Sequence, residues 1–81
     1  MQLGTRWSVG QEPPTALPEA MLVAVRTVEE ELADEGVDAS TWRWTLTWLE
    51  RRPIAELDDG TRIHLDTLGQ AVTTPPHDDE P

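Results

Sequence analysis

Three side chains near the middle of the chain have the chemistry of metal ligands. His64 and Asp66 are two residues apart, so a β-strand would place both on one side, and Glu56 lies a short distance before them. Zinc is bound by imidazole and carboxylate groups when three or four of them converge. A single strand histidine is far more often an ordinary surface residue. Because Ser8 and Ser40 also have no nearby histidine to activate them, we expect a protein that is not an enzyme, with no metal and no cofactor.

The densest charged surface of the chain is acidic and falls within residues 29–38. A run of like charges is usually only a solvated face. The functional alternative is a docking surface for a basic protein. In its extreme form this would be DNA mimicry, with carboxylates in the place of phosphates. The acidic residues concerned are Glu29, Glu30, Glu31, Asp34, Glu35 and Asp38.

Composition limits the classes of partner and compartment. The 81 residues include 16 acids and six bases, for a formal net charge of −10. This charge disfavours direct binding to nucleic acid or to an anionic membrane. The absence of cysteine excludes disulfides and thiolate chemistry. The longest apolar run, residues 20–25, is too short to span a bilayer, and the N-terminus does not have the pattern of a signal peptide. We therefore expect a cytoplasmic protein.

The spacing of apolar residues predicts a helix over residues 17–35. Leu17, Met21, Val25, Val28 and Leu32 recur every three or four positions and would form one apolar face. Pro18 suits the first turn, where its missing N–H is not needed. Gly36 suits the left-handed position that follows a helix.

Residues 42–66 alternate between apolar and polar side chains and predict a three-stranded antiparallel meander. We expect a four-residue loop at 50–53, with Leu49 opposite Ile54. A three-residue loop at 58–60 would have Gly60 in a left-handed bulge position. With these turns Glu56 lies opposite Arg62 on the outer side. The side that faces the helix would carry Trp44, Leu46, Trp48, Ala55, Leu57, Ile63 and Leu65.

The two ends of the chain complete the predicted fold. Alternation within residues 1–10 indicates a further strand at an edge of the sheet. Residues 73–81 have nothing to bury, so they predict a disordered acidic tail. The fold class is α+β, with one amphipathic helix packed on a three- to four-stranded antiparallel sheet in β-α-β-β-β order. A single domain would span residues 1–72.

Three apolar residues are candidate contacts with a partner. Trp42 lies at the outer end of a predicted strand, where a partly exposed tryptophan is typical of a binding anchor. Leu49 and Ile54 interrupt the polar outer side and would form a small apolar patch, although exposed apolar pairs are common.

Together these features favour a small acidic, non-catalytic protein-binding domain that acts on a basic protein surface. It could serve as a regulator, an accessory subunit or an inhibitor. One alternative is a homo-oligomeric structural domain that self-associates through a sheet edge, and another is a DNA-mimic inhibitor of a nucleic-acid-binding protein. The candidate partner-binding residues are Glu29, Glu30, Glu31, Asp34, Glu35, Trp42, Leu49 and Ile54.

Overall fold

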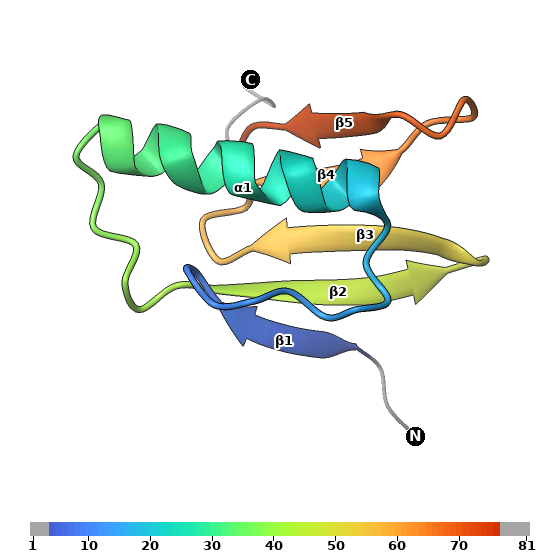
Figure 1. Cartoon of the computed structure of the whole chain (residues 1–81), viewed down its shortest axis with the longest axis horizontal. Coiled ribbons are helices and arrows are strands. Elements are labelled where there is room, and N and C mark those ends of the chain that lie inside the picture. The colour runs from blue at the N-terminus through green and yellow to red at the C-terminus, as the bar shows by residue number, and fades with distance from the viewer. Residues whose placement is uncertain (1–3, 77–81) are drawn as a thin grey trace.

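The computed structural model describes residues 4–76, which form one helix and one antiparallel sheet (Figure 1). The sheet has the order β1-β2-β3-β4-β5, so each strand pairs with the next one along the chain. The α+β class and the antiparallel sheet are as predicted, but the sheet has five strands rather than three or four. The elements are β1 Thr5–Ser8, α1 Glu19–Asp34, β2 Arg43–Leu49, β3 Arg52–Leu57, β4 Arg62–Leu65 and β5 Ala71–Thr74.

Strand β5 lies partly where the sequence predicts a disordered tail. Thr73 and Thr74 pair with Ile63 and Arg62 of β4, so the prediction of disorder is wrong for these two residues. A strand at a sheet edge obtains its backbone hydrogen bonds from its neighbour and needs few apolar side chains of its own. Residues 77–81, the rest of the predicted tail, lie outside the described residues.

Strand β1 forms the opposite edge of the sheet, as the alternation near the N-terminus predicts. It pairs with β2 and places Trp7 opposite Trp44. Both indoles are buried, and they stack with their ring centroids 6.1 Å apart and their planes 13° from parallel. The stacked pair fills the part of the core that lies against β1 and β2, on the side of the sheet that faces the helix.

Helix α1 begins at Glu19, two residues later than predicted. Pro18 has φ −60° and ψ 149°, so it occupies the N-cap position with an extended backbone, and its carbonyl accepts hydrogen bonds from Met21 and Leu22. At the other end Gly36 has φ +76°. The Gly36 and Val37 N–H groups donate to the carbonyls of Ala33 and Leu32, which is the Schellman pattern of helix termination.

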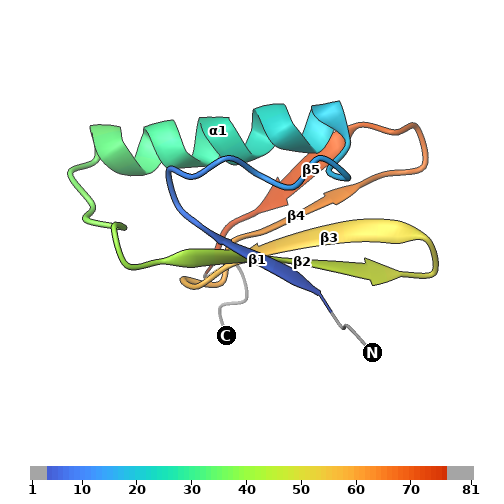
Figure 2. The same cartoon turned by 60° about the horizontal axis from the view of Figure 1, so that its bottom comes forward.

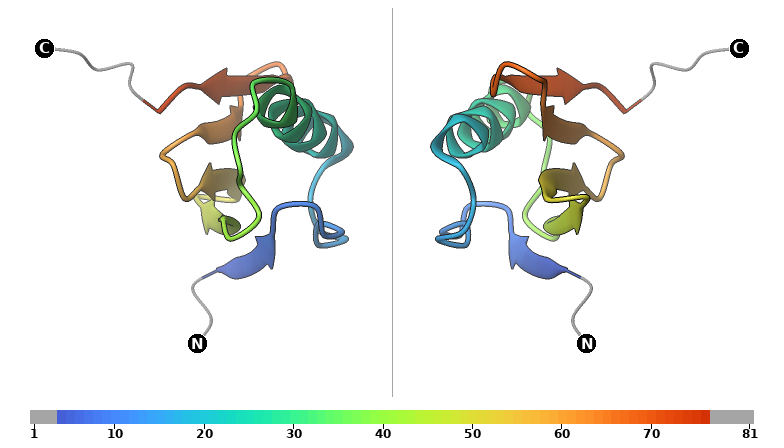
Figure 3. Two further views of the ribbon diagram at one scale, coloured as in Figure 1. Left: turned by 90° about the vertical axis from the view of Figure 1, so that its left-hand side faces the viewer. Right: turned by 90° about the vertical axis from the view of Figure 1, so that its right-hand side faces the viewer.

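The sheet curls around the helix. Figure 3 shows the strands nearly end-on, with α1 inside the curve, and Figure 2 shows the helix lying along β4 and β5. The segment from residue 9 to residue 18 crosses the remaining opening between β1 and the helix, and it buries Leu17 there. The core therefore lies between the concave side of the sheet and two covering segments. It contains Trp7, Leu17, Met21, Val25, Val28, Trp44, Leu46, Ala55, Leu57 and Ile63.

The hairpin between β2 and β3 is tighter than predicted. Leu49 pairs with Arg52, so the loop contains only Glu50 and Arg51 rather than residues 50–53. Both loop residues have positive φ, 53° and 69°, as a type I′ turn requires. The register shifts by two residues, and an even shift leaves every side chain on its predicted side of the sheet.

Trp48 is the exception among the predicted inner residues. It has the expected orientation and pairs with Pro53, but its side chain is 48% exposed. The tip of the β2–β3 hairpin extends past the N-terminal end of α1 (Figure 1), so no helix covers it there. The prediction that Trp48 belongs to the core is therefore wrong.

The turn between β3 and β4 has the predicted form. Gly60 has φ +102°, and Ala55 pairs with Ile63. Glu56 lies opposite Arg62, and their side chains form an ion pair at 3.7 Å. Of the two turns on which the predicted meander rests, this one is confirmed in full.

The strained hairpin turn gives a first prediction. Replacing Glu50 with Asn and Arg51 with Gly supplies the residues that tolerate positive φ, so the free energy of unfolding should rise by about 1 kcal/mol. Urea denaturation measures this change. The control, Glu50→Ala with Arg51→Ala, removes the same side chains without relieving the backbone, and an equal gain in the control would contradict a backbone origin.

The two buried indoles give a second prediction. Trp44 Nε1 donates a hydrogen bond to Glu29 Oε2 at 2.9 Å, whereas Trp7 Nε1 is buried with no partner among the described residues. Trp7→Phe and Trp44→Phe remove similar ring volumes, but only Trp44→Phe removes a formed hydrogen bond. Trp44→Phe should therefore cost about 1–3 kcal/mol more in unfolding free energy than Trp7→Phe. Equal losses of unfolding free energy in thermal or urea denaturation would contradict the hydrogen bond from Trp44 to Glu29.

Candidate functional site

The solvent side of the C-terminal half of α1 is a continuous acidic surface. Four carboxylate side chains project from it into solvent, and the last turn of the helix contains no basic residue. Within residues 4–76 the structure gives no ion pair to any of them. We call this surface the acidic ridge, and it consists of Glu30, Glu31, Asp34 and Glu35.

Glu29, the fifth candidate on the helix, has a structural role that the sequence does not reveal. Its side chain is only partly exposed, and its Oε2 accepts hydrogen bonds from Trp44 Nε1 at 2.9 Å and from the Gly10 backbone N–H at 3.4 Å. The carboxylate therefore joins the helix to the sheet and to the segment that follows β1. Glu29 therefore lies between the acidic ridge and the sheet, and its carboxylate is not one of the exposed carboxylates of the ridge.

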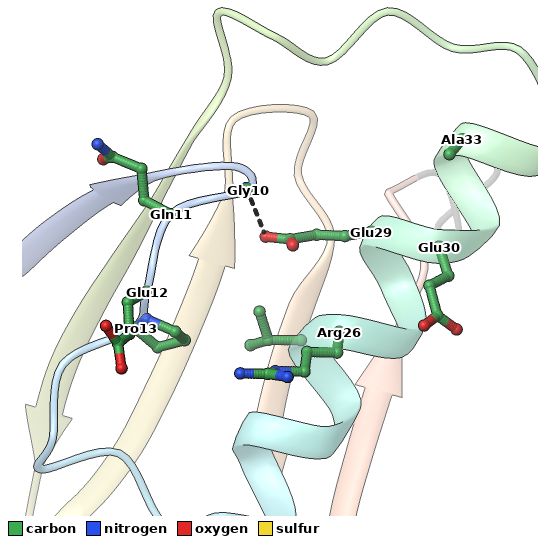
Figure 4. Close-up of a pocket in the computed structure, with 9 residues that line it drawn as sticks. Gly10, Gln11, Glu12, Pro13, Arg26, Glu29, Glu30 and Ala33 are labelled. Atoms are coloured by element: carbon green, nitrogen blue, oxygen red, sulfur yellow. Dashed lines mark hydrogen bonds between the residues drawn. The ribbon is translucent and has the colours of Figure 1, made fainter.

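A cavity of about 540 Å³ lies beside the ridge, between α1 and the segment that follows β1 (Figure 4). Arg26 and Glu29 point from the helix toward this segment. Three carboxylates, the Arg26 guanidinium and short apolar side chains share the walls. The formal charge of the lining is therefore −2, and the cavity suits a ligand with a cationic end and an aliphatic stem. The lining residues are Gly10, Gln11, Glu12, Pro13, Val25, Arg26, Glu29, Glu30 and Ala33.

A second cavity of about 400 Å³ lies on the other side of the helix, next to β5. It contains three carboxylates and no basic residue. Its apolar wall comes from the helix and from the two prolines after β5. The lining residues are Val28, Glu31, Leu32, Glu35, Asp59, Thr61, Thr73, Pro75 and Pro76. The acidic ridge is thus flanked by two cavities whose linings have a negative formal charge, and we call these two cavities the grooves.

The loop after the helix extends the negative surface toward β2. The hydroxyl and backbone N–H of Ser40 hydrogen-bond the exposed carboxylate of Asp38 and hold its pKa below its usual value. Trp42 follows and is half-buried against the core, with its backbone bonded to Val9 and Ala39. Only part of its indole is available to a partner.

Leu49 and Ile54 lie on the opposite side of the molecule from the ridge. They are diagonal neighbours, because Leu49 pairs with Arg52 and Ile54 pairs with Thr47. Both line a small pocket near the β2–β3 hairpin. The eight predicted site residues therefore fall on separate surfaces: the five acids lie on or beside the ridge, Trp42 lies at one end of the sheet, and the aliphatic pair lies on its outer side.

The triad of potential metal ligands does not form a site. Glu56 pairs with Arg62, and Asp66 accepts hydrogen bonds from the Leu68 and Gln70 N–H groups in the β4–β5 turn. Across residues 4–76, no three His, Asp or Glu side chains are grouped so that they could hold a metal ion. Nor does this part of the chain contain a helix with the length and hydropathy needed to cross a bilayer.

The sequence does not identify the cavity-lining residues that come from outside the helix. Glu12 and Gln11 approach α1 only because the segment after β1 folds back over the sheet, and Asp59 approaches because of the β3–β4 turn. Nothing in the local pattern of these segments indicates such contacts. Comparisons with protein-family models, with curated proteins and with solved structures give no match.

The two roles of the helix carboxylates give a third prediction. Glu29→Ala should lower the unfolding free energy by about 1–2 kcal/mol, because the buried Trp44 N–H loses its acceptor. Glu30→Ala, one residue along on the exposed ridge, should change it by less than about 0.5 kcal/mol. Glu29→Gln keeps an acceptor oxygen, so its unfolding free energy should lie between those of the two alanine variants. Equal urea midpoints for the two alanine variants would contradict the structural role of Glu29.

Proposed function

We propose that the chain is a small non-catalytic protein-binding domain that binds a basic protein surface through the acidic ridge and its two grooves. The observation that carries the proposal is the shape of this surface: a helix bears exposed carboxylates, and a cavity lies on each side of it. Lysine and arginine side chains have aliphatic stems and charged ends, and each groove combines apolar walls with carboxylates. The partner's basic side chains would enter the grooves while its backbone crosses the ridge.

Electrostatics favour this class of partner. Carboxylates at the C-terminal end of a helix add to the negative end of the helix dipole, so the potential there attracts cations. The formal charge of −10 extends that attraction beyond contact range, which accelerates encounter with a basic protein. Regulator, accessory subunit and inhibitor are all roles that such a domain could perform in the cytoplasm.

The free edges of the sheet favour a second candidate, a homo-oligomeric structural domain. Strands β1 and β5 each pair on one side only among the described strands. An unpaired edge can add a strand from another copy. In that case the assembly would form at the edges and would not depend on the acidic ridge.

The fourth prediction tests the ridge with matched charge changes. The probe is a fluorescein-labelled lysine-rich peptide, and its anisotropy reports binding to the intact chain. Glu30→Gln with Asp34→Asn should weaken binding about three- to tenfold, because two exposed charge pairs are lost. Glu19→Gln with Glu50→Gln removes the same charge elsewhere and should have an effect of less than about twofold.

Equal weakening by the two double variants would show that only net charge matters and would contradict the proposal. Sedimentation at rising concentration distinguishes the edge-pairing candidate, which predicts oligomers that both double variants retain. Competition by heparin for a nucleic-acid-binding partner tests the DNA-mimic alternative, in which heparin and this chain would occupy the same groove.

A further inference from the structure

The side of the sheet that faces away from α1, here called the outer sheet face, has the opposite charge to the ridge. The strand register places four of the six arginines of the chain on it and one acid, Glu56, so these strand positions have a formal charge of +3, and Glu50 in the β2–β3 turn adds one carboxylate beside them. All four arginines are exposed. They are Arg6, Arg43, Arg52 and Arg62.

Most of this positive charge is available for binding. Glu56 pairs with Arg62 at 3.7 Å, and both side chains remain about half exposed. Within residues 4–76 no ion pair involves the other three arginines. The chain has a net charge of −10, so three arginines on one side of the sheet that form no ion pair within residues 4–76 are a local reversal of sign.

The same face contains an apolar pocket next to Arg52. The pocket has a volume of about 210 Å³ and is lined by Leu49, Glu50, Arg52, Ile54, His64 and Leu65. Leu49 is 60% exposed although it is aliphatic. Cofactors and drug-sized ligands occupy about 300–1,000 Å³, so this pocket suits a single side chain. An anchor residue that enters such a pocket is the usual centre of a protein interface.

We propose that the outer sheet face binds an acidic protein segment that carries one aliphatic side chain. The aliphatic side chain enters the pocket between Leu49 and Ile54, and the neighbouring carboxylates meet Arg52 and the arginines along the strands. The arginines favour an acidic segment by charge complementarity, and the pocket favours a segment with an aliphatic side chain that can enter it.

A nucleic acid does not suit this face. The His64 imidazole is the one aromatic ring at the outward positions of the five strands, and these positions carry no Trp, Tyr or Phe on which successive bases could stack. A long polyanion would also meet the acids of the rest of the chain. A short acidic segment is held by the local charge alone.

This surface is independent of the acidic ridge, and it lies on the opposite side of the sheet from the helix (Figure 2). If both surfaces are used, the chain joins a basic partner on one side to an acidic partner on the other. Either surface can fail its test without affecting the other.

The fifth prediction uses a fluorescein-labelled peptide rich in aspartate and glutamate with one central leucine. Arg52→Gln should weaken its binding about three- to tenfold, whereas Arg26→Gln, the same charge change on α1, should have an effect of less than about twofold. The peptide with serine in place of leucine should bind the original chain more weakly. Ile54→Thr keeps a β-branched residue in the strand and should abolish the difference between the two peptides.

Chemical shifts of the ¹⁵N-labelled chain locate the peptide, and we expect the changes in β2, β3 and β4. The proposal is wrong if the leucine and serine peptides bind equally, if Arg26→Gln and Arg52→Gln have the same effect, or if the shifts map to α1. It is also wrong if sedimentation shows self-association that Arg52→Gln removes while the peptide fails to bind, because a second copy would then occupy this face.

Discussion

A single helix is too narrow to cover the sheet on which it lies, so the fold depends on other groups that cover the rest of the sheet. A helix with its side chains is about 10–12 Å across, whereas five strands about 4.8 Å apart span about 19 Å. Helix α1 lies along β4 and β5, and the stacked indoles of Trp7 and Trp44 fill the space under β1 and β2. The curl of the sheet and the segment from residue 9 to residue 18 close the remaining opening between β1 and the helix (Figure 3). Glu29 ties these parts together, because its carboxylate reaches the sheet and that segment from the helix.

This arrangement separates the charges of the molecule by layer. The inner side of the helix is fully used by the core, so the acids in the C-terminal half of the helix other than Glu29 face solvent. No element within residues 4–76 covers the outer sheet face, so it is free to carry arginines. An unfavourable concentration of carboxylates near the helix C-terminus is tolerated because the packing of Met21, Val25 and Val28 holds the helix in place. The two surfaces proposed for binding are therefore consequences of how the core is covered.

The sequence predicts those features that local periodicity determines. The face of α1 that contains Met21 and Val25, the left-handed Gly36 and Gly60, and the sides of β2 to β4 all follow from spacing and turn chemistry. Features that depend on where one element ends relative to another are missed. Trp48 has the predicted orientation, but the periodicity of β2 does not indicate that α1 stops short of it. The two-residue turn at Glu50 and Arg51 lacks the usual Asn-Gly signal. Strand β5 has almost no apolar pattern, and its pairing with β4 is visible only in three dimensions. For the candidate site, the acids are evident from the sequence, but the grooves and the separate role of Glu29 are not.

Hydrogen exchange of the four indole N–H groups, followed by NMR, tests the central claim most directly. Trp44 donates to Glu29 within the covered half of the sheet, so its indole proton should exchange only when the helix detaches. Trp48 lies beyond the end of the helix and should exchange at a rate close to that of a free indole. If the Trp44 proton exchanges as fast as the Trp48 proton, the helix is not fixed to the sheet at Glu29, and the explanation of how one helix covers five strands is wrong.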